Sequence, residues 1–298
     1  MRGLVRVALA TALCVLSFGQ AAPAGAAEEL PILFATAEGE IVRVNADGSG
    51  RAVVAADPNG YQEYRAPDLS PDGRRVAFAK CDPGVTASFP DPTCALAVVD
   101  LDGTDLRELP AYGVTAPRWS PDGRRITFAN ANDVIVIDAD GRNERTVVWG
   151  GQYPDWTPDG SRLIFGSWEE GKGQALYTVS ADRTEPRRRL GPWFSHIKWP
   201  TYSPDGRRIA FLEGQNSAIV VVNRDGSDAR RVITRRCGCL GRPGWSPDSK
   251  HIVHAERPSG SGAEWGPLVI ENLTTKRTTQ SGGPGALWAS WAGPRTAA

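Results

Sequence analysis

The feature that most limits the fold of this chain is a hairpin motif that occurs five times. One copy reads Trp119-Ser-Pro-Asp-Gly-Arg-Arg-Ile-Thr-Phe128. The Ser or Thr that opens each copy stands at position 70, 120, 157, 203 or 246, so the copies lie 50, 37, 46 and 43 residues apart. Repeats of this length are typical of solenoids, propellers and other arrays. In each copy Pro and Asp suit a tight turn, Gly supplies the left-handed residue after it, and the flanking apolar residues predict strands.

A second motif alternates with the first and predicts two further strands. It is an apolar strand followed by an Asp-Gly or related turn and then a short strand. Its six copies begin at Ile41, Leu96, Val134, Leu176, Ile219 and Leu268. Four short strands per repeat, without the 3.6-residue period of an amphipathic helix, predict the four-stranded blade of an all-β propeller.

The unequal counts of the two motifs predict how the ring closes. The second motif occurs six times and the first only five times. The C-terminal stretch 286–294 carries the motif's Trp but no blade after it, and Trp291 lies 46 residues beyond Trp245. We therefore expect this stretch to supply the innermost strand of the blade whose other three strands come from the N-terminal region. This closes a six-bladed ring and removes two exposed sheet edges.

Together these repeats resemble the TolB-type (WD-like) β-propeller repeat. The resemblance rests on the Trp-Ser-Pro-Asp-Gly-Arg-Arg-Ile-x-Phe hairpin followed by an Ile-x-Val-Val-Asp-x-Asp-Gly strand and turn, and it covers nearly all of residues 30–294. It implies a six-bladed propeller of the cell envelope that binds other proteins. TolB also carries an N-terminal α/β domain. The repeats here begin about ten residues after the expected cleavage site, so we expect no such domain and no TolB role in the Tol–Pal system.

The N-terminal 27 residues have the pattern of a secretory signal peptide. A short basic start precedes an apolar run from Val7 to Phe18 and a stretch of small residues with Ala-x-Ala spacing. We expect residues 28–298 to form a single propeller domain that is secreted or resides in the periplasm or cell envelope. No later segment reaches the 18 apolar residues of a membrane span. The 34 basic residues balance the 34 acidic residues, so no overall field favours binding to nucleic acid.

Four cysteines follow the signal peptide, an even number that favours disulfides after export. Cys81 and Cys94 bracket one loop between two predicted strands, and we expect a bond that joins the loop's ends. Cys237 and Cys239 would close a very small, strained ring, so a bond between them would be labile. No histidine lies near this pair, so we expect no zinc site.

The residues that could carry chemistry favour structural roles. The five aspartates of the Ser-Pro-Asp-Gly motif are explained by turn geometry, and the Asp-Gly loops lack the closing Glu of an EF-hand calcium loop. The chain has no Gly-x-Ser-x-Gly elbow for a hydrolase serine. His254 stands where other copies have Phe and is expected to pack inside its blade, whereas His196 lies in a loop between blades. We expect no metal and no cofactor.

The irregular connections are the better place for a binding site. The two turn types share one face of a propeller, so the longer connections gather on the other, and aromatic and arginine side chains there are typical of binding surfaces. The candidate residues on this face are Tyr61, Tyr64, Tyr112, Tyr153, Trp168, Trp193, Phe194, His196, Arg235, Arg236 and Trp265.

These features favour an exported, non-enzymatic, monomeric propeller that binds a protein or cell-envelope component through the irregular loops. The alternative is a propeller enzyme, a lyase or a metal-dependent lactonase-like hydrolase, with its site at the mouth of the central channel. A purely architectural module is a third possibility. The sequence does not name the partner, because a propeller scaffold is compatible with many functions.

Overall fold

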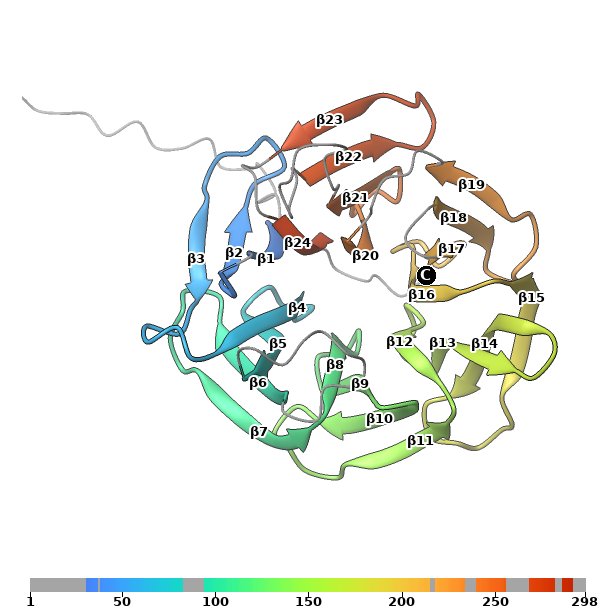
Figure 1. The fold of residues 1–298 in the computed structure, drawn as a ribbon, viewed down its shortest axis with the longest axis horizontal. Coiled ribbons are helices and arrows are strands. Elements are labelled where there is room, and N and C mark those ends of the chain that lie inside the picture. Colours follow the sequence, from blue (N-terminus) through green and yellow to red (C-terminus); the bar gives the residue numbers. More distant parts are fainter. Residues whose placement is uncertain are drawn as a thin grey trace, which may run out of the picture.

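The computed structural model describes residues 31–36, 38–82, 94–214, 218–233, 240–255, 268–281 and 286–291, with the backbone alone at 240, 281 and 286–291. Six four-stranded antiparallel sheets surround a common centre (Figure 1). The described residues contain no helix, and thus none that is long and apolar enough to cross a membrane. The predicted signal peptide lies outside the described residues.

The strands follow the predicted repeats, and the blades are numbered here from the N-terminus. Blade 1 comprises β24 (Ala286–Trp291), β1 (Ile32–Thr36), β2 (Ile41–Val44) and β3 (Ala52–Ala55). Blade 2 comprises β4 (Glu63–Leu69), β5 (Arg75–Cys81), β6 (Ala95–Asp100) and β7 (Arg107–Tyr112). Blade 3 comprises β8 (Val114–Trp119), β9 (Arg125–Asn130), β10 (Asp133–Asp138) and β11 (Arg145–Trp149).

The second half of the ring repeats this order. Blade 4 comprises β12 (Gln152–Trp156), β13 (Arg162–Glu169), β14 (Gly173–Ser180) and β15 (Arg188–Phe194). Blade 5 comprises β16 (Ile197–Tyr202), β17 (Arg208–Glu213), β18 (Ala218–Asn223) and β19 (Arg230–Ile233). Blade 6 comprises β20 (Leu240–Trp245), β21 (His251–Ala255), β22 (Leu268–Asn272) and β23 (Thr278–Ser281).

The predicted ring closure is confirmed. The C-terminal strand β24 pairs antiparallel with β1, with Ile32 opposite Trp291 and Thr36 opposite Ala286. Figure 1 shows β24 beside β1, which places the two ends of the propeller sequence in one blade. Blade 1 is thereby completed, and neither terminal strand remains an unpaired edge.

The core lies between neighbouring blades rather than in the middle of the ring. The two central strands of each blade are buried on both faces, as in β9, where Ile126, Phe128 and Ala129 are at most 1% exposed. One apolar cluster packs blade 2 against blade 3 through Leu96, Trp119 and other buried side chains. Strands that are covered on both faces read as continuous apolar runs, which explains the uninterrupted second motif of the sequence.

The Ser-Pro-Asp-Gly turns have the expected geometry. In the turn before β9 the Ser120 hydroxyl donates to the Asp122 carboxylate at 2.6 Å and accepts from the backbone N–H of Arg125 at 2.9 Å. Gly123 has a φ of 67°, the left-handed conformation that glycine adopts without strain. Burial acts to raise the pKa of Asp122, but the hydrogen bonds from Ser120 and Arg124 outweigh it and lower that pKa. The aspartate therefore stabilises the turn as an ionised acceptor.

Candidate functional site

The ring has two faces that differ in the regularity of their connections. The turn face carries the Ser-Pro-Asp-Gly turns between first and second strands and the Asp-Gly or related turns between third and fourth strands. The loop face carries the connections between second and third strands and those between consecutive blades. This division agrees with the one expected from the sequence. Those predicted binding residues that the structure describes belong to the loop-face ends of their strands or to the loop-face connections.

Three predicted aromatic residues are widely exposed at this face. The exposed fractions are 70% for Tyr61, 65% for Tyr112 and 56% for Trp168. They come from the β3–β4 connection, the end of β7 and the end of β13, so they are distributed over the arc from blade 1 to blade 4. Exposed aromatic side chains of this size are typical anchors of protein interfaces.

The backbone holds these three side chains on ordered supports. The Asp57 carboxylate accepts the backbone N–H groups of Asn59 at 3.2 Å and of Tyr61 at 2.7 Å, which fixes the β3–β4 connection. The carbonyl of Tyr112 accepts the side-chain amide of Asn130 at 3.0 Å. Trp168 lies inside the β13–β14 ladder, opposite Gln174. Binding residues supported in this way lose little conformational entropy on association.

Other predicted residues are wholly or partly buried. Tyr64 is 3% exposed and packs its ring 4.8 Å from that of Phe78, while Tyr153 is 9% exposed with its ring 5.1 Å from that of Trp199. Because both tyrosines are buried, neither side chain is available to a partner at the loop face. The half-buried Trp193 packs against the core between blades 3 and 4.

Phe194 ends β15 of blade 4, and His196 lies two residues further along the chain, in a different environment. Phe194 is half-buried and makes an edge-on contact with Phe211, with ring centroids 4.9 Å apart. His196 is exposed, and its ring lies 6.2 Å from that of Trp168. This pair of rings brings together two predicted residues from different connections. The predicted residues Arg235, Arg236 and Trp265 lie outside the described residues.

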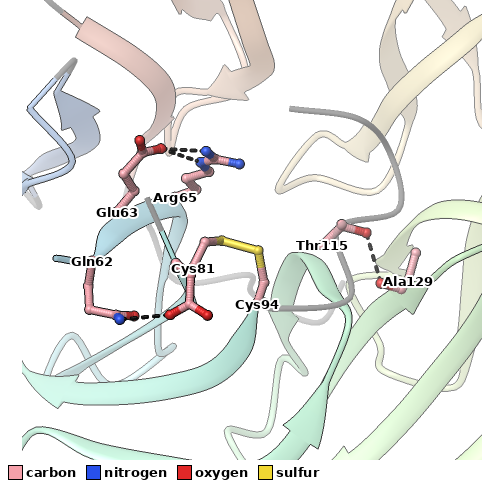
Figure 2. The surroundings of a disulfide bond; sticks show 8 residues. Gln62, Glu63, Arg65, Cys81, Cys94, Thr115 and Ala129 are labelled. Atoms are coloured by element: carbon pink, nitrogen blue, oxygen red, sulfur yellow. Dashed lines mark hydrogen bonds and ion pairs between the residues drawn. A yellow bond between two sulfur atoms is a disulfide. The ribbon is translucent and has the colours of Figure 1, made fainter. Parts of the chain in front are cut away.

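The predicted disulfide between Cys81 and Cys94 is present, at the loop-face root of the β5–β6 connection (Figure 2). Both cysteines are buried, at 0% and 2% exposure. Beside the bond, the Gln62 side chain donates to Asp82 at 2.8 Å, and Glu63 pairs with Arg65. The disulfide closes a sequence separation of 13 residues, and in the chain-entropy account a loop of this size contributes about 3 kcal/mol to stability. Cys237 and Cys239 lie outside the described residues.

A buried ion-pair network crosses the centre of the ring and was not anticipated from the sequence. Arg118 of β8 is 3% exposed; its guanidinium lies 2.9 Å from Asp155 of β12 and 3.1 Å from Asp68 of β4. Arg242 of β20 also contacts Asp68, at 3.1 Å. The same carboxylates accept the backbone N–H of Trp119 at 2.9 Å and of Tyr202 at 3.2 Å. The network therefore joins the innermost strands of five blades, since Arg118 also reaches Thr201 of blade 5 at 3.5 Å.

A recurring bulge in the innermost strands points these polar side chains inward. Ala66, Ala116, Tyr153 and Trp199 all have φ between 49° and 53°, and each precedes a proline. The pairing register shifts at the same place in β4, β8, β12 and β16. The sequence signal is an X-Pro-polar triplet just before the aromatic or apolar residue and the turn motif. It repeats with the blades and could have pointed to these polar residues, although not to their contacts with one another.

His254 is enclosed within blade 6. His254 of β21 is 2% exposed, and burial lowers its pKa to about 4. The interpretation of His254 as a packed blade residue is therefore confirmed. Among the described residues no group of three or more His, Cys, Asp or Glu side chains is placed to hold a metal ion.

The comparisons with known proteins connect the chain to others through structure. No family model and no curated protein matches it. TolB from Acinetobacter baumannii is similar with a TM-score of 0.70 and 20% identity, over 88% of this chain and 66% of that one. A putative TolB from Agrobacterium tumefaciens has a TM-score of 0.66 and 18% identity, over 89% of this chain and 93% of that one.

A solved structure with a different activity is also similar. An oligogalacturonate lyase in complex with manganese has a TM-score of 0.58 and 19% identity, over 81% of this chain and 73% of that one. This chain spans slightly less than two thirds of the Acinetobacter TolB. At these levels of identity the likeness concerns the fold. By its six four-stranded blades and its repeated hairpins, the chain is a six-bladed β-propeller whose fold is similar to that of these TolB structures.

Proposed function

We propose that this protein is an exported, non-enzymatic propeller that binds a protein or cell-envelope ligand through its loop face. The observation that carries the proposal is the exposure of Tyr61, Tyr112 and Trp168 on ordered supports at that face. A large aromatic side chain exposes apolar surface to water, which is unfavourable, and a partner that covers this surface is stabilised by its burial. The turn face is built instead from repeated hydrogen-bonded turns.

Two features support export. The first 27 residues have the basic, apolar and small-residue regions of a signal peptide. The Cys81–Cys94 disulfide is of the kind that persists in oxidising compartments. The similar TolB structures support the propeller scaffold on which a binding surface would be presented.

The enzyme alternative would place a site at the central channel, as the likeness to the oligogalacturonate lyase suggests. The central acids Asp68 and Asp155 are each almost fully buried and are held by Arg118. Removing one partner of a buried ion pair costs roughly 3–5 kcal/mol, because the other charge is left without compensation. These acids thus serve to hold the blades together, which favours the binding function over a catalytic one.

The test is affinity capture from envelope and culture fractions of the source cells. The variant Tyr61→Ala/Tyr112→Ala/Trp168→Ala should retain the partner at least about tenfold less well, because each anchor contributes on the order of 1 kcal/mol or more. The matched control is Val53→Ala/Leu106→Ala, which removes exposed apolar side chains (49% and 45%) away from the loop-face connections. Unchanged melting temperatures would show that both variants fold. Equal capture by the loop-face variant and the parent protein would contradict the proposal.

A further inference from the structure

The repeat allows the junction between two blades to be compared with its equivalents around the ring. At three junctions an arginine at the start of a second strand covers the tryptophan that precedes the next turn motif. Arg75 lies 4.8 Å from the ring of Trp119, Arg125 lies 4.8 Å from Trp156, and Arg208 lies 5.0 Å from Trp245. These contacts fill the turn-face groove between blades 2 and 3, 3 and 4, and 5 and 6.

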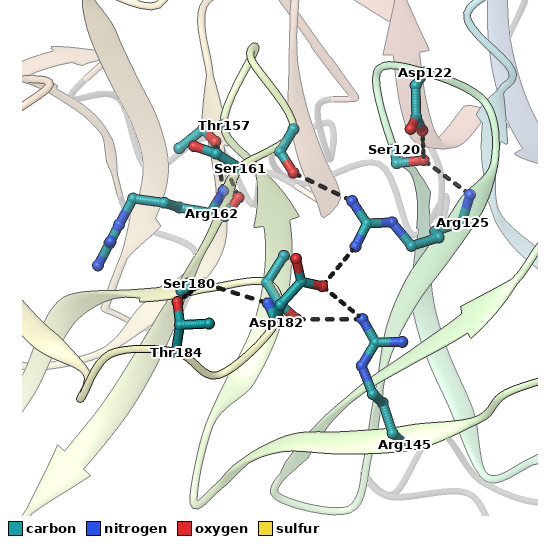
Figure 3. A network of polar contacts seen from close by, with 12 residues as sticks. Ser120, Asp122, Arg125, Arg145, Thr157, Ser161, Arg162, Ser180, Asp182 and Thr184 are labelled. Atoms are coloured by element: carbon teal, nitrogen blue, oxygen red, sulfur yellow. Dashed lines mark hydrogen bonds and ion pairs between the residues drawn. The ribbon is translucent and has the colours of Figure 1, made fainter.

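The junction between blades 3 and 4 has an additional ionic contact (Figure 3). The carboxylate of Asp182, in the turn after β14, forms ion pairs with Arg125 at 3.2 Å and with Arg145 at 3.1 Å. Arg125 also donates to the carbonyl of Gly160 at 3.4 Å. One carboxylate therefore lies between two guanidinium groups and closes the groove.

The junction between blades 4 and 5 differs from the others in the identity of its aromatic residue and in the contacts of its arginine. Tyr202 stands where the other three junctions have tryptophan. Arg162, the equivalent of Arg125, is directed instead to Thr178 at 3.1 Å and to Glu185 at 2.6 Å. In Figure 3 the guanidinium of Arg162 points away from the Asp182 cluster.

The outer part of the same junction departs as well. Asp225 is the equivalent of Asp182, and it accepts the backbone N–H and the hydroxyl of Ser227 at 3.0 and 2.7 Å. Arg145 stands opposite Val136 in the β10–β11 ladder, and Arg188 stands opposite Thr178 in the β14–β15 ladder. Val136 and Thr178 have the same place in their blades, so the two arginines are equivalent. Unlike Arg145, Arg188 forms no ion pair within 4.0 Å among the described residues.

A cleft lies at the position that the arginine–tryptophan contacts cover at these three junctions. Its volume is about 570 Å³, and its lining includes Arg162, Arg188, Arg207, Arg224 and Tyr202. This volume is in the range of small-molecule sites. Arg224 follows β18 at a position where the equivalent residue of blade 4 is Ala181, so a cation is added in the blade that borders the cleft.

The charges in the cleft favour an anion. The guanidinium groups of Arg188, Arg207 and Arg224 have no ion pair in the part of the chain that the structure describes. The three acids of the lining, Asp159, Asp205 and Asp225, are hydrogen-bonded within their own turns, as Asp159 is by Thr157 at 2.6 Å and Ser161 at 3.0 Å. The nearby charges of Arg224 and Arg188 contribute to lowering the pKa of Asp159 and of Asp225, respectively, without a contact short enough to be an ion pair. Burial raises the pKa of Tyr202 to about 12 against the opposing charge of Arg224, so its phenol is protonated and can donate a hydrogen bond.

We propose that the cleft between blades 4 and 5 on the turn face binds a small ligand with a carboxylate or phosphate group. The ligand's oxyanion would lie between Arg188, Arg224 and Arg207, in the role that the Asp182 carboxylate has at the preceding junction. Guanidinium groups are suited to both anions because their planar donors match two oxygens at once. The site is separate from the loop face, so it does not depend on the function proposed above.

The test is isothermal titration of the full propeller with inorganic phosphate and, separately, with citrate. One of the two should bind at a single site, and Arg188→Ala/Arg224→Ala should weaken that binding at least about tenfold, because two guanidinium groups that donate charge-assisted hydrogen bonds are lost. Preference for phosphate or for citrate would identify the source of the oxyanion. The matched control is Arg142→Ala, which removes an arginine that is 82% exposed on the turn face of blade 3 and should leave the affinity unchanged.

A second variant tests the cleft without changing its charge. Tyr202→Trp introduces the residue of the other three junctions, so the variant should fold with an unchanged or higher melting temperature and lose the ligand by filling the cleft. Three results would overturn the proposal. These are binding of neither anion, equal weakening by Arg142→Ala, and full binding by both the double arginine variant and Tyr202→Trp.

Discussion

Burial of His254 gives one side chain a measurable effect on the stability of the whole chain. It occupies the position of Phe78, Phe128, Phe165 and Phe211 in the other blades, and its surroundings lower its pKa from 6.5 to about 4. In the unfolded chain the imidazole takes up a proton below about pH 6.5, whereas in the folded protein it stays neutral until about pH 4. Between these values the unfolded state binds more protons, so stability falls as the pH is lowered.

The predicted consequence is a pH-dependent free energy of unfolding that His254→Phe removes. In the parent protein this free energy should fall by roughly 3 kcal/mol between pH 6.5 and pH 4, at about 1.4 kcal/mol per pH unit. The variant should lose most of that slope, because Phe does not titrate. Urea unfolding at several pH values measures it, and His196→Asn, at an exposed position, serves as the control. An unchanged slope in His254→Phe would contradict the burial of a neutral imidazole.

The lowered pKa of the turn aspartates acts in a different pH range. For Asp72 and Asp122 burial acts to raise the pKa, but hydrogen bonds from the turn and nearby arginines outweigh it. Their contribution is therefore present above the unfolded value near 4 and is lost as the pH falls through the lower folded value. The contribution of these aspartates begins to fall only below about pH 5, so it overlaps the effect of His254 only in the lower part of the range between pH 6.5 and pH 4.

For single side chains, prediction from the sequence succeeded where a local rule applies. The turn roles of Asp72 and Asp122 follow from hydrogen bonding within four residues. Tyr64 and Tyr153 were expected at the loop face but are buried, because the first residues of an innermost strand already lie between two blades. The sequence distance between Asp68, Arg118 and Asp155 hid their contact, since it depends on the curvature of the ring.

Among the strands, β24 has the largest structural consequence. It is the innermost strand of a blade whose other strands come from the opposite end of the chain. The sequence predicted this closure because the two motifs occur in unequal numbers. The bulges of the innermost strands were not predicted, because a positive φ at alanine, tyrosine or tryptophan is rare and the following proline does not by itself indicate it.

Removal of β24 should destabilise the whole ring. A chain that ends before Pro284 leaves β1 unpaired on its inner side, with the lost contacts costing several kcal/mol. Because 1 kcal/mol shifts the melting temperature of a chain of this size by about 2–4 °C, we expect a decrease of about 10 °C or more. Thermal unfolding followed by circular dichroism measures it, with a chain that ends after Gly293 as the control. An unchanged transition in the shorter chain would show that β24 does not close the ring.

At the scale of the whole molecule, the ring combines structural residues that serve the repeated blades with surface residues that do not follow the repeat. The buried Asp68–Arg118–Asp155 network joins the blades at the centre, and the repeated turns cover one face. The loop face presents Tyr61, Tyr112 and Trp168, which no repeat rule requires to be aromatic. The open cleft between blades 4 and 5 is a second departure from the repeat, on the turn face. The fold could be predicted from the sequence because its motifs repeat. The exposure of the loop-face aromatics and the cleft between blades 4 and 5 could not, because these features do not repeat.

Amide hydrogen exchange of the free and the partner-bound protein would show which face of the ring binds the partner. We expect exchange to slow on binding in the β3–β4 connection around Tyr61, in the β13–β14 hairpin beside Trp168 and in the β15–β16 connection around His196. The Ser-Pro-Asp-Gly turns at 70–73, 120–123 and 203–206 should exchange at unchanged rates. Slowing confined to those turns, with none in the loop-face connections, would contradict binding through the loop face.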